Sequence, residues 1–109
     1  MSCIFCKIAN KEVKSSIVHE SENVIAFDDA VPQAPVHVVV MPKEHVLGLS
    51  GLNGILPEIF GAVEKVSEVK GVRDTGYRVV MNIGKDPGQA VSHLHFHVLG
   101  GRKLNWPPG

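Results

Sequence analysis

Apolar side chains recur along the chain with two different periods, and the change of period separates strands from a helix. Three early segments are rich in β-branched and aromatic side chains and are bounded by polar or proline-containing turns, as is typical of strands. They are residues 17–21, 23–29 and 36–42. From about Asn53 to Lys70 the apolar residues recur at steps of three and four, which predicts an amphipathic helix. Either Asn53 caps its start or Pro57 lies in its first turn, and Gly71 suits its end.

Two further strands are expected in the C-terminal half, at residues 76–84 and 91–101, and a short helical turn with a loop at residues 3–13. Strands in succession with one main helix favour an α+β fold, in which the helix covers one face of a five-stranded antiparallel sheet. The length of 109 residues is that of a single domain, residues 1–109.

Charge and composition remove several classes of function. The 11 basic and 11 acidic residues balance, so there is no electrostatic argument for binding nucleic acid or an anionic membrane. No apolar run approaches the roughly 20 residues of a membrane span, and the first residues lack the pattern of a signal peptide. We therefore expect a cytoplasmic protein without nucleic acid or membrane as a partner, in which the two cysteines serve a purpose other than a disulfide.

The most distinctive stretch is "HLHFHVL", in which His93, His95 and His97 alternate with large apolar residues. Residues two apart on a strand share a face, so the imidazoles are expected on one face and the apolar side chains on the core side. A histidine can act as a nucleophile, a general acid or base, or a metal ligand. The alternation alone leaves these roles open.

Polar groups near the three histidines extend the candidate site. The segment "NIGKDPGQAVS" contains a glycine- and proline-rich loop whose backbone amides can bind phosphate oxygens, although most such loops are only turns. Asn82 ends the preceding strand and either donates to an anion or closes the turn. His37 is a fourth imidazole on the 36–42 strand, and a lone histidine of this kind is more often structural than functional.

Cys3 and Cys6 form a Cys-x-x-Cys pair that has three interpretations. The spacing suits a metal site, which needs two further ligands, and His45 and one of the three alternating histidines are available. A redox pair of the thioredoxin type lacks its structural context. The third interpretation is two small buried hydrophobic residues.

Taken together, these motifs resemble the histidine triad (HIT) family, in its Hint branch. The family motif His-x-His-x-His-x-x with apolar intervening residues is matched by "HLHFHVL". The similarity extends through "FDDAVPQAPVHVVVMPKEH", "GYRVVMNIGKDPGQAVSHLHFHVLGGR" and the closing "NWPPG", and so covers nearly the whole chain. The resemblance implies a HIT-like fold, a two-fold dimer with a continuous ten-stranded sheet, and hydrolysis of purine nucleoside 5′-phosphoramidates such as AMP-NH2 or AMP-lysine.

The resemblance also implies roles for individual residues. His95 would attack the α-phosphorus to form a nucleotidyl-histidine intermediate, and His97 and His37 would complete the catalytic set. Asp29 would receive the ribose hydroxyls of the nucleotide, and its base would lie in an apolar pocket formed by Phe5, Ile8, Val13 and Phe27. The implied nucleotide-binding residues are Phe5, Ile8, Val13, Phe27, Asp29, Asn82, Gly88, Gln89, Ala90, Val91, His95 and His97. Ala90 departs from the animal Hint pattern, which usually has a serine there that is associated with protonating the leaving group.

A metal site follows from the resemblance to bacterial members with an N-terminal Cys-x-x-Cys. It implies one Zn2+ held by Cys3, Cys6, His45 and His93. Four protein ligands leave no open coordination position, so this zinc would be structural. No metal is then required for the phosphoryl chemistry.

Two alternative functions remain open at this point. One is a dinucleotide polyphosphate hydrolase or nucleotidyl transferase of the Fhit-like branch, although the "WPPG" ending favours Hint. The other is a zinc-containing module that binds nucleotides without turning them over. Turnover of an AMP amide distinguishes the non-catalytic module from the enzymes.

Overall fold

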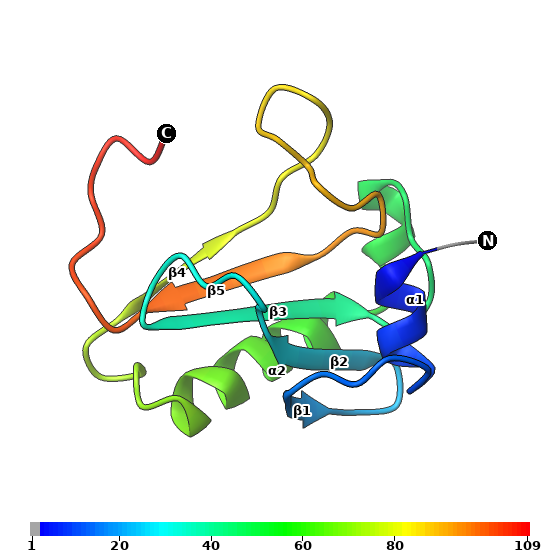
Figure 1. Cartoon of the computed structure of the whole chain (residues 1–109), viewed down its shortest axis with the longest axis horizontal. Helices are drawn as coiled ribbons and strands as arrows, with labels where there is room; N and C mark the ends of the chain where they lie inside the picture. Colours follow the sequence, from blue (N-terminus) through cyan, green and yellow to red (C-terminus); the bar gives the residue numbers. More distant parts are fainter. Residues whose placement is uncertain (1–2) are drawn as a thin grey trace.

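The computed structural model describes residues 3–109 and has an α+β architecture built on one five-stranded antiparallel sheet (Figure 1). The strand order across the sheet is β1-β2-β3-β5-β4. The elements are α1 (Ile4–Ala9), β1 (Ile17–Glu20), β2 (Val24–Asp28), β3 (Val36–Pro42), the 3-10 turn η1 (Leu49–Leu52), α2 (Leu56–Val69), β4 (Tyr77–Val80) and β5 (Phe96–Gly100). The predicted fold class is therefore confirmed.

The central strands are buried on both faces and contribute to two cores. On one face the side chains pack against α2, and on the other they pack against the short helix α1 (Figure 1). The core on the α2 side contains Val24, Ala26, Val38 and Val40 of these strands. The core on the α1 side contains Ile25, Phe27, Val39 and Met41. Because a slip of one residue would exchange these faces, burial on both sides fixes the register of β2 against β3.

Helix α2 begins at the second of the two positions that the sequence allows. Ile55 is the N-cap residue and Pro57 lies in the first turn, whereas Asn53 instead follows the 3-10 turn η1, which the apolar period did not reveal. Pro57 fits there because the first-turn N–H groups have no partner within the helix. After the C-cap Lys70, Gly71 adopts a positive φ of 70° and ends the helix as expected.

The last two strands are shorter than predicted. Strand β5 begins at Phe96, so the histidines before it lie outside the regular ladder. The N–H of Leu94 donates to the backbone oxygen of Val46 at 2.9 Å, and Nε2 of His93 lies 2.7 Å from the backbone oxygen of Pro42. These contacts draw the segment toward the end of β3 and the residues that follow it. The expected strand over 91–101 is therefore wrong in its first half.

The C-terminal segment leaves the sheet after β5 and extends away from it (Figure 1). The Trp106 ring is 79% exposed in the single chain, with the guanidinium carbon of Arg78 5.8 Å from its centre. Within residues 3–109, no helix combines the length and the apolar character needed to cross a membrane.

Candidate functional site

The candidate site lies on the sheet face opposite α2, where β3 and β5 run side by side. The register pairs Val39 with His97, and His37 lies two residues away on the same face of β3. On the opposite face, the apolar residues between the histidines are buried against α2, as the alternation predicts. They are Leu94, Phe96 and Val98. The histidines are less exposed than an open cleft would make them, since His93 is 0% and His95 5% exposed.

His95 is held in one tautomer by the backbone. Its Nδ1 lies 2.8 Å from the backbone oxygen of His93. A carbonyl oxygen only accepts hydrogen bonds, so in the neutral ring Nδ1 carries the proton and Nε2 keeps its lone pair. The Phe5 ring packs edge-to-face against the imidazole at 4.9 Å between centres. In the neutral ring, the Nε2 lone pair of His95 is therefore held in one orientation.

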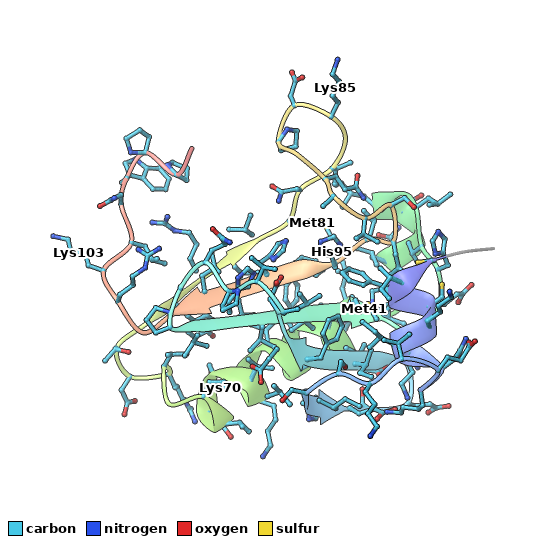
Figure 2. The ribbon with its side chains drawn as sticks, in the orientation of Figure 1. Met41, Lys70, Met81, Lys85, His95 and Lys103 are labelled. Atoms are coloured by element: carbon cyan, nitrogen blue, oxygen red, sulfur yellow. The ribbon has the colours of Figure 1, made fainter. Side chains whose placement is uncertain are left out.

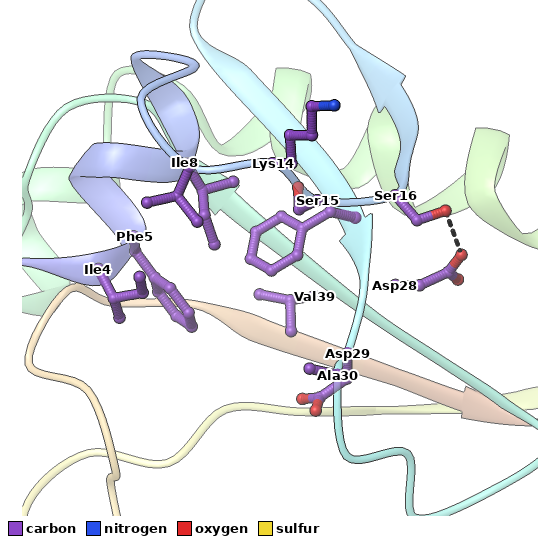
Figure 3. A pocket seen from close by; sticks show the side chains of 12 residues that line it. Ile4, Phe5, Ile8, Lys14, Ser15, Ser16, Asp28, Asp29, Ala30 and Val39 are labelled. Atoms are coloured by element: carbon purple, nitrogen blue, oxygen red, sulfur yellow. Dashed lines mark hydrogen bonds between the residues drawn. The ribbon is translucent and has the colours of Figure 1, made fainter.

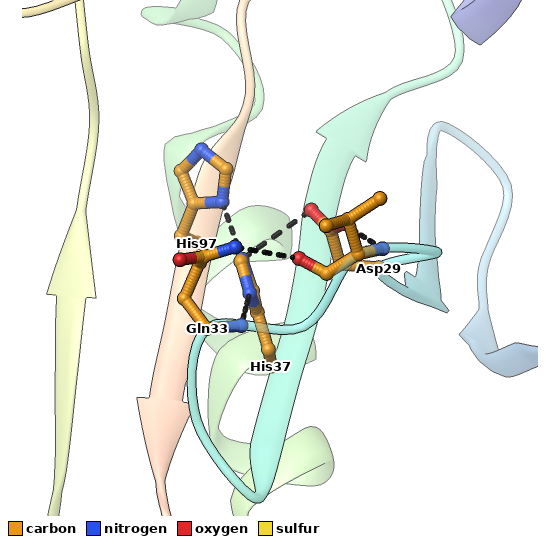
Figure 4. A network of polar contacts seen from close by, with 5 residues as sticks. Asp29, Gln33, His37 and His97 are labelled. Atoms are coloured by element: carbon orange, nitrogen blue, oxygen red, sulfur yellow. Dashed lines mark hydrogen bonds and ion pairs between the residues drawn. The ribbon is translucent and has the colours of Figure 1, made fainter.

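His37 and His97 form a chain of donors that begins at the main chain (Figure 4). The backbone N–H of Gln33 donates to Nδ1 of His37 at 2.9 Å. The proton of neutral His37 is then on Nε2, which donates to Nδ1 of His97 at 2.8 Å. His97 consequently carries its own proton on Nε2. This places a hydrogen-bond donor beside His95, whose ring centre is 4.9 Å from that of His97.

Burial keeps this pair of imidazoles neutral. It lowers the pKa of His97 to about 4, assisted by the neighbouring His95 and His37 and opposed by the Asp29 carboxylate. Burial likewise lowers the pKa of His37, again opposed by Asp29. Because both rings are neutral near pH 7, the tautomers assigned from the hydrogen bonds hold there.

The ligand atoms of Asp29, His37 and His97 also lie within 4.8 Å of one another, as a metal site would require. The two imidazole nitrogens are 2.8 Å apart, which is the length of a hydrogen bond. Around a tetrahedral zinc, two such nitrogens would be separated by about 3.3 Å. The geometry here is therefore that of a hydrogen-bonded network.

Asp29 lies where two cavities meet. The first, of about 480 Å³, is mainly apolar (Figure 3). Its lining includes all four predicted base-pocket residues: Phe5, Ile8, Val13 and Phe27. The second, of about 540 Å³, is lined by the three catalytic candidates and four other predicted residues: His37, His95, His97, Asn82, Gly88, Ala90 and Val91. Phe5 and Asp29 line both cavities. A ligand with a flat apolar ring and an anionic group therefore fits with its middle portion at Asp29.

Gln89 differs from the other predicted residues in how its side chain is used. Its Oε1 accepts from the N–H of Gly84 at 2.9 Å, and its Nε2 donates to the backbone oxygen of Val91 at 3.0 Å. The side chain thus closes its own loop, whose tip at Lys85 projects away from His95 (Figure 2). The sequence analysis missed Gln33, because a backbone N–H has no side-chain signature.

The predicted metal ligands come together at the start of α1. All four ligand atoms of Cys3, Cys6, His45 and His93 lie within 4.8 Å of one another. Cys6 Sγ is 3.2 Å from Nδ1 of His45 and 3.6 Å from Nδ1 of His93, which is 3.7 Å from Cys3 Sγ. Tetrahedral zinc separates sulfur and nitrogen ligands by about 3.3–3.8 Å. The donor set therefore fits zinc.

A second feature of His93 supports the fit. Its Nε2 lies 2.7 Å from the backbone oxygen of Pro42, so this nitrogen carries the proton and Nδ1 turns its lone pair toward the thiols. Metal-bound imidazoles commonly donate their other N–H to a carbonyl in this way. Burial lowers the pKa of His93, and the Pro42 contact opposes this effect. The lowered pKa favours the neutral ring, which is the form that binds metal.

Comparisons with known proteins agree with this geometry. A family model described as the HIT domain matches residues 10–104, and the chain belongs to the HIT family. It is 46% identical over 112 residues to a 14 kDa zinc-binding protein of Zea mays, covering 97% of this chain and 87% of that protein. It is 41% identical over 113 residues to a protein of Arabidopsis thaliana named adenylylsulfatase HINT1, covering 97% and 76%.

Among solved structures, the chain is similar to the crystal structure of a HIT family hydrolase from Legionella pneumophila Philadelphia 1. The TM-score is 0.93 at 39% identity, and the match covers 99% of this chain and 100% of that one. The family and fold expected from the sequence motifs are therefore confirmed.

The depressed pKa of His97 predicts a stability that depends on pH. Between pH 6.5, the ordinary value for histidine, and the folded value of about 4, the unfolded chain binds a proton that the folded chain does not. Stability should therefore fall as pH is lowered through this window and should stop responding to His97 below it. Calorimetric melting temperatures of the wild type and of His97→Gln, measured at a series of pH values, should show a shallower fall in the variant.

Both proteins keep the same four metal ligands, so any loss of metal in acid affects them alike. Equal pH slopes for the two proteins would show that His97 titrates normally in the folded state.

Proposed function

We propose that this protein hydrolyses purine nucleoside 5′-phosphoramidates through a nucleotidyl intermediate on His95. One observation carries the proposal: a nucleophilic imidazole lone pair lies beside an imidazole N–H in a cavity that continues into an apolar pocket. The lone pair is on His95 and the N–H is on His97. A phosphoryl group between them meets both an attacking atom and a donor for its oxygens.

The two cavities suit the parts of a purine nucleotide. The base occupies the apolar pocket that the aromatic rings of Phe5 and Phe27 line. Asp29, at the junction, accepts hydrogen bonds from the ribose hydroxyls. The α-phosphate then reaches the second cavity, where Asn82 and the backbone of the Gly88 loop line the wall.

The reaction proceeds by two displacements at phosphorus. In the first, Nε2 of His95 forms a bond to the α-phosphorus while the bond from phosphorus to the amine breaks. The N–H of His97 stabilises the charge on the phosphoryl oxygens. Ala90, which lines this cavity, has no hydroxyl group to donate, so the departing amine takes its proton from water. In the second displacement water attacks phosphorus and gives up a proton to the solvent, the bond to His95 breaks, and the nucleoside monophosphate and the free imidazole are released.

Zinc has a structural role in this proposal. Cys3, Cys6, His45 and His93 would supply four protein ligands to the ion, so no open position would remain for substrate. When bound, the ion ties the start of α1 to the segments that carry His45 and His93. The chemistry at phosphorus is carried by the imidazoles alone.

Replacing His95 with alanine tests the proposed nucleophile. Turnover of a fluorogenic adenosine phosphoramidate should fall by about 10³-fold or more, because the covalent route is lost. AMP affinity, measured by titration calorimetry, should change by less than about threefold, since the base and ribose contacts remain. The control is His19→Ala, which removes a histidine of β1 outside the site and should leave turnover unchanged.

A His95→Ala variant that retains more than about a tenth of wild-type turnover would exclude His95 as the nucleophile. A wild-type protein that binds AMP without turnover would support the non-catalytic module, and faster turnover of a dinucleotide polyphosphate would favour the Fhit-like alternative.

We also propose that the protein is a two-fold dimer with a continuous ten-stranded sheet. Strand β4 forms an edge of the sheet (Figure 1), and Val79 on it is 39% exposed. Phe60 on α2 is 49% exposed and Trp106 is 79% exposed, so large apolar groups are left uncovered in one chain. Pairing of β4 with β4 of a second chain would satisfy the unpaired backbone N–H and C=O groups of this edge. An interface above about 1,200 Å² would cover the exposed apolar side chains.

The two edges of the sheet provide a matched pair of variants. Val79→Glu on β4 should give monomers at micromolar concentration in sedimentation equilibrium, because a buried charge without a partner opposes pairing. Ile17→Glu on the opposite edge strand β1, where Ile17 is 42% exposed, should leave the dimer intact. A monomeric wild type, or dissociation caused only by Ile17→Glu, would contradict the proposed interface.

A further inference from the structure

We propose that occupancy of the Cys3, Cys6, His45 and His93 site by zinc controls the affinity for a purine nucleotide. The inference rests on the proposed function for the nucleotide site and adds a regulation of it. The structure offers two physical connections between the metal ligands and the nucleotide cavities. One runs through the side chains of α1 and the other through the backbone of His93.

Helix α1 carries metal ligands and pocket-lining residues together. Cys3 is its N-cap residue and Cys6 lies within it, whereas Phe5 and Ile8 line the apolar cavity. The helix has only six residues, which is too short to be stable without tertiary contacts. Its position, and therefore the shape of the cavity, depends on what holds it to the sheet.

Phe5 is the side chain that reaches both sites. It lies between the two cysteines in sequence, and its ring meets Phe27 edge-to-face at 5.5 Å between centres. The same ring packs against His95 at 4.9 Å and against His93 at 6.0 Å. A movement of α1 would therefore displace a wall of the base pocket and a contact of the nucleophile at the same time.

His93 provides the second connection. Its fully buried ring has Nδ1 near the thiols and Nε2 on the backbone oxygen of Pro42. Its own backbone oxygen receives Nδ1 of His95 at 2.8 Å. A change in the position of the His93 ring therefore affects the backbone oxygen of the same residue, which orients the His95 ring.

Two of the metal ligands, Cys3 and His45, also line a cavity at the surface. A cavity of about 490 Å³ is lined by Cys3, His45, Lys7 and the Ala90–Ser92 segment. Ala90 and Val91 of that segment line the phosphate cavity as well. This opening gives an ion a route to the site, as a metal that is taken up and released requires.

These connections predict that the binding of zinc and the binding of the nucleotide are coupled. Without a shared ion, the four ligands no longer restrain α1 and His93 together, and a nucleotide must order them as it binds. Its affinity is then reduced. Since coupling is reciprocal, a bound nucleotide raises the affinity for zinc by the same factor.

The experiment measures both halves of the coupling in the full-length protein. AMP affinity is determined by titration calorimetry for zinc-loaded protein and for protein stripped with a chelator. Zinc affinity is determined by competition with a chromophoric chelator, with and without AMP. We expect about a tenfold decrease of AMP affinity on stripping, and an equal increase of zinc affinity with AMP. His45→Asn, which removes a metal ligand that lies outside α1, should reproduce the stripped state, and His19→Asn should not.

Circular dichroism shows whether the stripped protein remains folded. If it does not, a second measurement tests the coupling in metal-loaded protein. Cobalt(II) replaces zinc, and its d–d absorption reports the ligand geometry. Saturating AMP should change this spectrum in the wild type, and Phe5→Leu should reduce the change. A spectrum unaffected by saturating AMP, or equal AMP affinities in folded loaded and stripped protein, would overturn the coupling. Loaded protein that binds no AMP would instead overturn the proposed function.

Discussion

The contact between the backbone oxygen of His93 and Nδ1 of His95, at 2.8 Å, is the interaction on which the rest of the site depends. It leaves the lone pair of His95 on Nε2 and holds the ring in one orientation. The contact exists because the chain leaves the sheet before Phe96, where Leu94 bonds to Val46 and the His93 ring bonds to Pro42. A regular strand through this segment would direct the His93 carbonyl into the ladder instead.

Two imidazoles of the same chemical type acquire opposite roles from their partners. Nδ1 of His95 meets a carbonyl, which leaves a lone pair on Nε2, whereas the chain of donors from Gln33 through His37 leaves an N–H on Nε2 of His97. Burial supports this division because it keeps the His37 and His97 rings neutral, with the pKa of His97 at about 4. A protonated His97 would have no lone pair to accept from His37, and the chain would be broken.

Much of this arrangement could be predicted from the sequence. The alternation correctly placed Leu94, Phe96 and Val98 in the core beneath α2, and the apolar period located that helix. The family resemblance selected the metal ligand set, where spacing alone had left three interpretations.

What the sequence analysis missed depends on contacts between distant segments. The bonds of His93 and Leu94 to residues 42–46 shorten β5, and no local propensity encodes them. The N–H of Gln33 is a main-chain group whose role appears only when β3 places His37 above it. Phe5 was expected in the base pocket, but its contacts with both His93 and His95 follow from how α1 docks on the sheet.

The central claim is that His95 becomes covalently linked to the nucleotide during turnover. Mass spectrometry of protein quenched while it hydrolyses an adenosine phosphoramidate tests this most directly. The account predicts an adenylyl group on the peptide that contains His95, located on that residue by fragmentation and absent from the His95→Ala variant. An adduct on His37 or His97, or rapid turnover during which no adduct forms even on the millisecond scale, would contradict it.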